Sequence, residues 1–121
     1  TPQDFWTTRC TNCPAALDSL DELAALCPSA SFVAVNIDGT DAAAATLVLE
    51  SASEGRWTRL KKVHLAEEDK ERAKALLGMR VVPFYVIVNQ GGAIVRSGTW
   101  KAVALTTPQD LENALAVTPA G

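Results

Sequence analysis

The chain has 121 residues, of which 48% are hydrophobic and 21% charged, and its formal net charge is −3 at pH 7. This length suffices for one core and is too short for two ordinary domains, so we expect a single domain over residues 1–121. The negative charge, with no basic run longer than RLKK at residues 59–62, gives no support for nucleic acid or an anionic membrane as a partner.

The first two predicted elements stand on either side of a cysteine pair. Residues 2–7, PQDFWT, are typical of a short strand, and an amphipathic helix is predicted over residues 14–27. The apolar residues of that helix recur at steps of three and four and form one stripe: Leu17, Leu20, Leu23, Ala24 and Cys27. Pro28 ends the helix, because the residue before a proline avoids helical geometry.

The middle of the chain alternates strands and helices. The segment SFVAVNID at residues 31–38 predicts a buried strand. The alanine-rich residues 41–54 predict a second helix, and residues 59–65, RLKKVHL, predict a short third strand.

A third helix is predicted over residues 67–78. Acidic residues open this segment, which favours a helix N-terminus, and Gly78 suits the left-handed position at its end. Ala73, Leu76 and Leu77 share one face of this helix.

The last third of the chain predicts a hairpin and a final helix. Residues 82–98 read as two apolar strands around a turn at residues 90–92. The apolar run at residues 81–88 is far too short to span a bilayer, so no membrane partner is expected. Residues 107–117 predict a helix capped by Thr107 and Asp110.

The order of these elements is β-α-β-α-β-α-β-β-α, which indicates a sheet with helices on both faces. Right-handed crossovers would make the first three strands parallel and leave the hairpin antiparallel.

Cys10 and Cys13 stand where the first strand gives way to helix. Unpaired N–H groups and a partial positive charge at a helix start stabilise a thiolate and lower a thiol pKa. Cys10, before the helix, is therefore suited to attack a substrate disulfide. Cys13, expected one turn inside the helix and within reach of Cys10, is suited to resolve the mixed disulfide.

Other readings of the pair stay open at this point. A zinc site usually needs four ligands, and the chain offers three cysteines and His64. Cys27 lies 14 residues after Cys13 on the same predicted helix, roughly 21 Å along its axis, so we interpret it as a small buried apolar residue. A cluster shared between two chains and an inert pair are the remaining alternatives. His64 is interpreted as a structural residue, and we expect no metal.

Two segments resemble the thioredoxin superfamily: DFWTTRCTNC at residues 4–13 and, some 70 residues later, VVPFYVIVNQGGAIVRSG at residues 81–98. The resemblance covers nearly the whole chain. The extra elements between residues 38 and 67 are most similar to the branch of TlpA, nucleoredoxin and the tryparedoxins. The resemblance implies an α/β, thioredoxin-like fold with a central mixed sheet of strand order 3-2-1-4-5 and helices on both faces.

The resemblance also implies a catalytic role for Asp4, which precedes Cys10 by six residues. A carboxyl buried beneath the cysteines would have a raised pKa and could take the proton of Cys13. Strand alternation places Asp4 and Trp6 on one face and Phe5 on the other. The alternative is an exposed Asp4 on a frayed strand.

The substrate-binding residues implied by the resemblance are Trp6, Thr11, Asn12, Val82 and Pro83. Pro83 falls at the position of the family's cis-proline, where the backbone of Val82 would face an extended substrate strand.

Three positions depart from the family pattern. Thr11-Asn12 replaces the Gly-Pro or Pro-Pro dipeptide, Arg9 replaces an aromatic residue, and Ala34 stands where a lysine often lies near the buried acid. Substrate range and redox potential are therefore left open.

We expect a thiol-disulfide oxidoreductase that acts on protein disulfides as a monomer. It would need no metal or organic cofactor and would take electrons from an external reductase or a small dithiol. The alternative is a redox-inactive adaptor or interaction domain of a larger protein. No signal peptide is visible, and the lack of an initiator Met fits a fragment of a longer chain. Among compartments we favour the cytoplasm.

Overall fold

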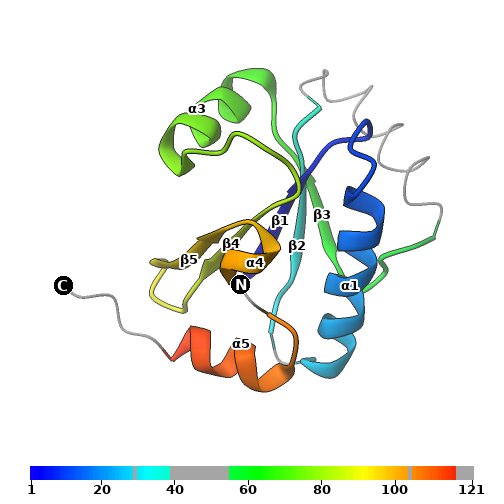
Figure 1. The fold of residues 1–121 in the computed structure, drawn as a ribbon, viewed down its shortest axis with the longest axis vertical. Helices are drawn as coiled ribbons and strands as arrows, with labels where there is room; N and C mark the ends of the chain where they lie inside the picture. The colour runs from blue at the N-terminus through cyan, green and yellow to red at the C-terminus, as the bar shows by residue number, and fades with distance from the viewer. Residues whose placement is uncertain (29, 39–54, 104, 117–121) are drawn as a thin grey trace.

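The computed structural model describes residues 1–28, 30–38, 55–103 and 105–116, which form a five-stranded sheet with helices against it (Figure 1). The strands are β1 (Pro2–Trp6), β2 (Val33–Asn36), β3 (Lys61–His64), β4 (Phe84–Val88) and β5 (Ile94–Gly98). The helices are α1 (Cys13–Leu26), α3 (Glu67–Leu77), α4 (Trp100–Val103) and α5 (Pro108–Leu115). The helix predicted over residues 41–54 lies outside the described residues.

The sheet has the order β3-β2-β1-β4-β5, as predicted, with β1 in the centre. β1 runs parallel to β2, and β2 runs parallel to β3. β4 is antiparallel to both β1 and β5. The predicted directions of the strands are therefore confirmed.

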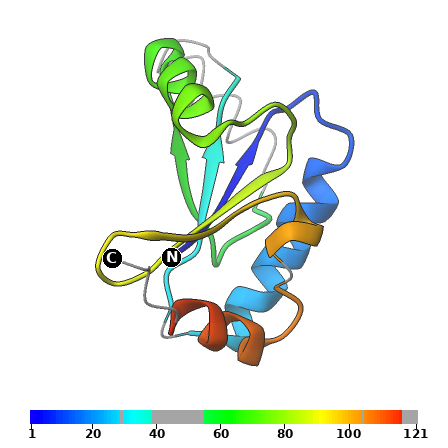
Figure 2. The same cartoon turned by 60° about the vertical axis from the view of Figure 1, so that its left-hand side comes forward.

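The two faces of the sheet bury separate groups of apolar side chains. Trp6 of β1 joins one cluster with the buried stripe of α1 and with Leu111 of α5. Phe5 of β1 joins the other cluster, against which Ala73 and Leu77 of α3 pack. Figures 1 and 2 show α1 and α5 on the opposite side of the sheet from α3. The alternation predicted along β1 is thus observed.

Helix α1 begins one residue earlier than predicted. Cys13 is the first residue of α1, and Pro14 occupies the first turn. Cys13 therefore lies at the start of the helix, and the expectation that it lies one turn inside is wrong. The predicted stripe is otherwise confirmed, because Leu17, Leu20, Leu23 and Ala24 are buried. Cys27 follows the helix as its C-cap and is half-buried rather than buried.

Helix α3 packs only lightly on the sheet. None of its residues, all of which are described, is fully buried, and Leu76 is 86% exposed. Ala73 and Leu77, one turn apart, make its contact with the second core cluster. Leu76 lies off that narrow contact line, although the helical pattern places it on the same face as Ala73 and Leu77. Gly78 ends α3 at φ 63°, as its left-handed role requires.

The segment before β3 is fastened to the outside of α1. The indole of Trp57 is buried, packs edge-on against Trp6 with ring centroids 5.8 Å apart, and donates a hydrogen bond of 2.7 Å to Asp18 of α1. The guanidinium of Arg56 lies 2.8 Å from the same carboxylate. These contacts hold the chain between α1 and the edge strand β3.

The end of the chain contains one element that was not predicted, the four-residue helix α4. Gly98, two residues before the start of α4, has φ 132°, and the side chain of Ala102 lies close to it. α5 carries the predicted capping box, in which the Thr107 hydroxyl accepts from the Asp110 N–H and the Asp110 carboxylate accepts from the Thr107 N–H. A search of the described helices finds none with the length and apolar character needed to cross a membrane.

Candidate redox site

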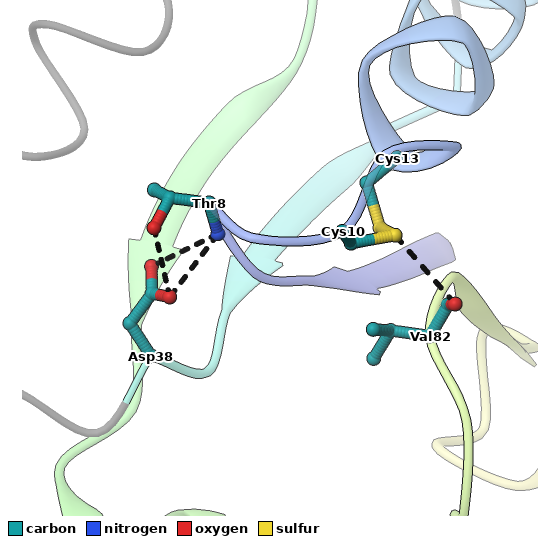
Figure 3. Close-up of a disulfide and its surroundings, with 5 residues drawn as sticks. All are labelled: Thr8, Cys10, Cys13, Asp38 and Val82. Atoms are coloured by element: carbon teal, nitrogen blue, oxygen red, sulfur yellow. Dashed lines mark hydrogen bonds between the residues drawn. A yellow bond between two sulfur atoms is a disulfide. The ribbon is translucent and has the colours of Figure 1, made fainter.

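The two cysteines of the motif form a disulfide at the start of α1 (Figure 3), with their Cα atoms 5.3 Å apart. A tight turn leads into the helix, in which the N–H of Cys13 donates to the carbonyl of Cys10. Cys10 is half-buried, whereas Cys13 is 0% exposed. A partner arriving from solution therefore meets the sulfur of Cys10 first.

The loop before β4 lies against this disulfide. The Sγ of Cys10 is 3.6 Å from the carbonyl oxygen of Val82, although the two residues are 72 positions apart in the chain (Figure 3). The Val82–Pro83 peptide bond is cis, as predicted. Both residues are partly exposed, so a molecule bound at Cys10 would also touch this loop.

Asp4 lies in the central strand and is 0% exposed, which excludes the alternative of an exposed residue on a frayed strand. Neither oxygen of its carboxyl has a hydrogen-bond partner among the described residues. Its neighbours in the sheet are Ala34 on β2 and Tyr85 on β4. Ala34 offers only a methyl group where a cation could have balanced the carboxylate.

These surroundings explain why the carboxyl of Asp4 holds its proton. Burial raises the pKa of its carboxyl from 3.8 to about 8, because a charged carboxylate would lose its hydration there. Burial, and then the charge of Asp4, also raise the pKa of Tyr85. At neutral pH the Asp4 carboxyl is therefore mostly protonated, and it is poised to exchange a proton near pH 8.

The five expected substrate contacts differ in their exposure. Thr11 and Asn12 are exposed between the two cysteines, and Val82 and Pro83 are partly exposed beside them. Trp6 is only 2% exposed and lies in the core cluster that contains Cys13. The structure thus leaves no indole surface for a substrate at Trp6 and places this residue beneath the site.

A polar network that the sequence analysis missed holds the loop that leads to Cys10. The N–H and the hydroxyl of Thr8 donate to the carboxylate of Asp38 at 3.1 and 3.0 Å (Figure 3). The Asn36 side-chain amide donates to the same carboxylate at 2.7 Å, and its carbonyl oxygen accepts from the Asp38 N–H. His64 Nδ1 lies 2.9 Å from that oxygen, so the ring nitrogen must be the donor.

Metal binding finds no support in the described part of the chain, where no group of three or more His, Cys, Asp and Glu side chains could hold an ion. The remaining cysteine, Cys27, is far from the motif at the other end of α1. Burial, and then the negative charge of Glu112, raise the pKa of its thiol, so Cys27 is a poor nucleophile.

Three solved structures share this architecture. A protein from Chlorobium tepidum, described as the thiol:disulfide interchange protein DsbE, superposes on this chain with a TM-score of 0.72 at 18% sequence identity. The superposition covers 95% of this chain and 79% of that protein. A secreted Mycobacterium tuberculosis disulfide oxidoreductase homologous to E. coli DsbE gives a TM-score of 0.58 over 77% of this chain and 63% of its own, at 22% identity. StoA from Bacillus subtilis gives a TM-score of 0.56 over 79% of this chain and 69% of its own, at 20% identity.

By sequence, no family model and no curated protein matches the chain. The structural similarities, together with the strand order, confirm the predicted α/β, thioredoxin-like fold. The narrower assignment to the TlpA, nucleoredoxin and tryparedoxin branch stays a prediction.

Proposed function

We propose that this chain, which has a thioredoxin-like fold, is a thiol-disulfide oxidoreductase acting on protein disulfides through Cys10 and Cys13. The observation that carries the proposal is the asymmetry of the pair. One sulfur is accessible beside the Val82–Pro83 loop, and the other is fully buried at the first residue of a helix. The solved structures with this fold include proteins named for thiol-disulfide chemistry.

The first step would use the accessible sulfur. The Cys10 thiolate attacks one sulfur of a substrate disulfide, the substrate S–S bond breaks, and the other substrate sulfur leaves as a thiolate. Cys10 is then joined to the substrate in a mixed disulfide. Thr11, Asn12, Val82 and Pro83 lie around that bond and are our proposed substrate contacts.

The second step would use the buried sulfur. Cys13 loses its proton and attacks the Sγ of Cys10, so that the Cys10–Cys13 disulfide forms and the second substrate thiolate leaves. Two electrons have then passed from the protein to the substrate. An external reductase or small dithiol restores the two thiols, and the same steps in reverse oxidise a dithiol.

Asp4 is our proposed acid–base group for the second step. It faces the same side of the sheet as Trp6, which shares a core cluster with Cys13. A carboxyl with a pKa of about 8 is matched to a thiol, whose ordinary pKa is about 8.5. Asp4 would enter this step ionised and take the proton of Cys13.

Turnover separates this proposal from a redox-inactive adaptor. We expect the chain to accelerate the reduction of insulin disulfides by dithiothreitol, and Cys10→Ser to abolish the acceleration. Cys27→Ala is the matched control and should keep it, because Cys27 lies outside the site. No acceleration by the wild-type chain would favour an adaptor.

Trapping tests the roles of the two sulfurs. Cys13→Ser leaves Cys10 without a resolving thiol, so mixed disulfides with protein substrates should accumulate, and gels run without reductant should show them. Cys10→Ser should trap far less, since Cys13, the remaining sulfur of the pair, is fully buried. Equal trapping by both variants would refute the assigned roles.

A further inference from the structure

A small cationic hollow lies directly beside the cysteine site. Two of its walls come from the segments that hold Cys10: Thr7, whose carbonyl accepts the Cys10 N–H, and Val82, whose carbonyl lies 3.6 Å from the Cys10 sulfur. Three further walls carry positive charge: Lys70, Lys74 and Arg80. A chain attached to Cys10 through a disulfide would therefore pass next to these cations.

The cations of the hollow are poorly neutralised. Lys70 and Lys74 stand one turn apart on α3, and Arg80 follows the glycine that ends this helix. Within the described ranges, no carboxylate lines the hollow, and neither Lys74 nor Arg80 forms an ion pair. Lys70 is 3.9 Å from the exposed Glu67. This local charge is opposite in sign to the net charge of −3.

The size and lining of the hollow indicate what it can accept. Its volume of about 190 Å³ is below the roughly 300–1,000 Å³ of sites that enclose a whole small molecule. Its remaining lining is apolar: Ile37, Met79 and Val81. Methylene groups fit such walls, and a carboxylate fits the cations. An aspartate or glutamate side chain has both parts.

The other side of Pro83 has a different character. A second hollow of about 220 Å³ is lined by Pro83, Tyr85 and Trp100 and by residues of the first turns of α1, and none of its lining residues is charged. A substrate strand lying across Val82 and Pro83 would thus meet cations on one flank and apolar groups on the other.

We propose that the cationic hollow binds an acidic side chain in the segment of a protein substrate that flanks the disulfide attacked by Cys10. The inference rests on the proposed function for its biological setting. It adds a substrate class: disulfides with a carboxylate beside one of the reacting cysteines, on one flank only.

The test uses peptides that contain one cysteine and carry Glu on its N-terminal flank, Glu on its C-terminal flank, or Gln on both. Each peptide is used as its disulfide-linked dimer, and kcat/KM is measured with excess dithiothreitol. We expect one of the two Glu peptides to exceed the Gln peptide by about five-fold, as two or three exposed ion pairs allow. Salt at about 1 M shortens the Debye length to roughly 3 Å and should remove most of this preference.

Charge-matched variants locate the preference. Lys74→Gln and Arg80→Gln should each lower the Glu-to-Gln ratio, and the double variant should bring it near one. Arg72→Gln removes the same charge from the opposite face of α3, where Arg72 pairs with Asp69, and should keep the ratio. The proposal would be overturned if all peptides reacted equally or if Glu on either flank gave the same preference. It would also be overturned if Arg72→Gln lowered the Glu-to-Gln ratio as much as Lys74→Gln and Arg80→Gln do.

A binding equilibrium makes the test independent of turnover. In a Cys13→Ser, Cys27→Ala background, Cys10 is first joined to 2-mercaptoethanol. Each peptide thiol then displaces it, so that the peptide–Cys10 disulfide forms and 2-mercaptoethanol leaves. The same Glu preference is expected in this exchange constant. A Glu preference in this exchange without turnover by the wild-type chain would support the binding of an acidic side chain in the hollow and refute the oxidoreductase activity. Turnover without a Glu preference would support the activity and refute the binding.

Discussion

Asp4 is a carboxyl group held where neither water nor, among the described residues, any hydrogen-bond donor reaches it. A buried polar group without partners costs free energy, and such groups in folded proteins call for an explanation. A proton-transfer role supplies one, because it needs a pKa near that of a thiol. Burial keeps this pKa high, and the methyl group of Ala34 beside the carboxyl offers no cation that would lower it.

Asp4→Asn should therefore slow the resolution of the mixed disulfide and spare the first attack by Cys10. Loss of general acid–base catalysis typically costs about 100-fold or more. Single-turnover kinetics with a fluorescent peptide disulfide, measured across pH 6–9, would resolve the two steps. Asp69→Asn, on the exposed side of α3, is the matched control and should leave both steps unchanged. A wild-type pH profile in the Asp4→Asn variant would contradict the assignment.

The spacing of the motifs predicted much of the site at the level of single residues. The proximity of Cys10 and Cys13, the burial of Asp4 and the cis bond before Pro83 could be predicted, because each follows a local rule of spacing or resemblance. The bond from Thr8 to Asp38 could not be predicted, since it joins side chains 30 positions apart at the ends of two strands. The burial of Trp6 depends on Trp57, which reaches it only through the fold.

Among the elements, the segment of residues 55–60 connects two parts of the fold through one side chain. Trp57 contacts Trp6 beneath the site and bonds to Asp18 on α1. The pKa of Asp18 is lowered, since hydrogen bonds from Arg56 and Trp57 outweigh the effect of burial. The buried indole, rather than the exposed Arg56–Asp18 pair, should dominate the stability of this connection.

Trp57→Ala should lower the free energy of unfolding by about 3–5 kcal/mol, as expected for removing a large buried aromatic side chain. Trp57→Phe should cost less, because it keeps the ring and loses only the bond to Asp18. Arg56→Gln removes the exposed ion pair and should cost about 0–1 kcal/mol. Chemical denaturation of the oxidised proteins would rank the three variants. An equal loss from Arg56→Gln and Trp57→Ala would show that the indole is not the main contact.

The junction between β5 and α4 depends on Gly98. A Cβ at this position would lie 2.9 Å from the Cβ of Ala102, and φ is 132°. Gly98→Ala should therefore cost about 1–3 kcal/mol of stability for the backbone alone, and more with the close contact. Repeating Gly98→Ala in an Ala102→Gly background should recover only the contact part. Gly91→Ala is the control, since its nearest contact is an ordinary 3.4 Å and its φ is not in the left-handed region.

Hydrophobic period and turn chemistry predicted most elements and the strand order, but not every detail. α4 has only four residues, too few to show a helical period. The pattern of Ala73, Leu76 and Leu77 predicts a shared face, but it cannot reveal how narrow the contact of α3 with the sheet is.

For the molecule as a whole, Asp4 makes stability depend on pH. Its folded pKa of about 8 lies above the ordinary 3.8, so between these values the unfolded chain has released a proton that the folded chain keeps. The stabilising effect of this proton is complete below about pH 4 and is lost as pH rises toward 8, by up to about 1.4 kcal/mol per pH unit.

The slope of stability against pH is the clearest measure of this effect. We expect the wild-type free energy of unfolding to fall more steeply than that of Asp4→Asn between about pH 5 and pH 8, and the two slopes to agree above pH 9. Denaturant titrations at fixed ionic strength would give both curves. Parallel curves between pH 5 and pH 8 would show that Asp4 titrates alike in the folded and unfolded chain.

The cationic hollow is also a property of the whole molecule, and the sequence could not have predicted it. Lys70, Lys74 and Arg80 are spread over eleven positions, and no basic run marks them. Only the fold brings them to the Val82 loop.

The central place of β1 has a consequence for how this domain acquires its shape. β1 is made first among its strands, yet one of its two partners, β4, begins at residue 84. During synthesis the strand that will be the most enclosed must wait with an open edge until residues 84–88 have been made. Pairings so distant in the chain form slowly, because a long loop has to close before any contact rewards it. The Val82 loop, 72 residues after Cys10, therefore reaches the cysteines late in this process, and the open edge of β1 is exposed to aggregation in that interval.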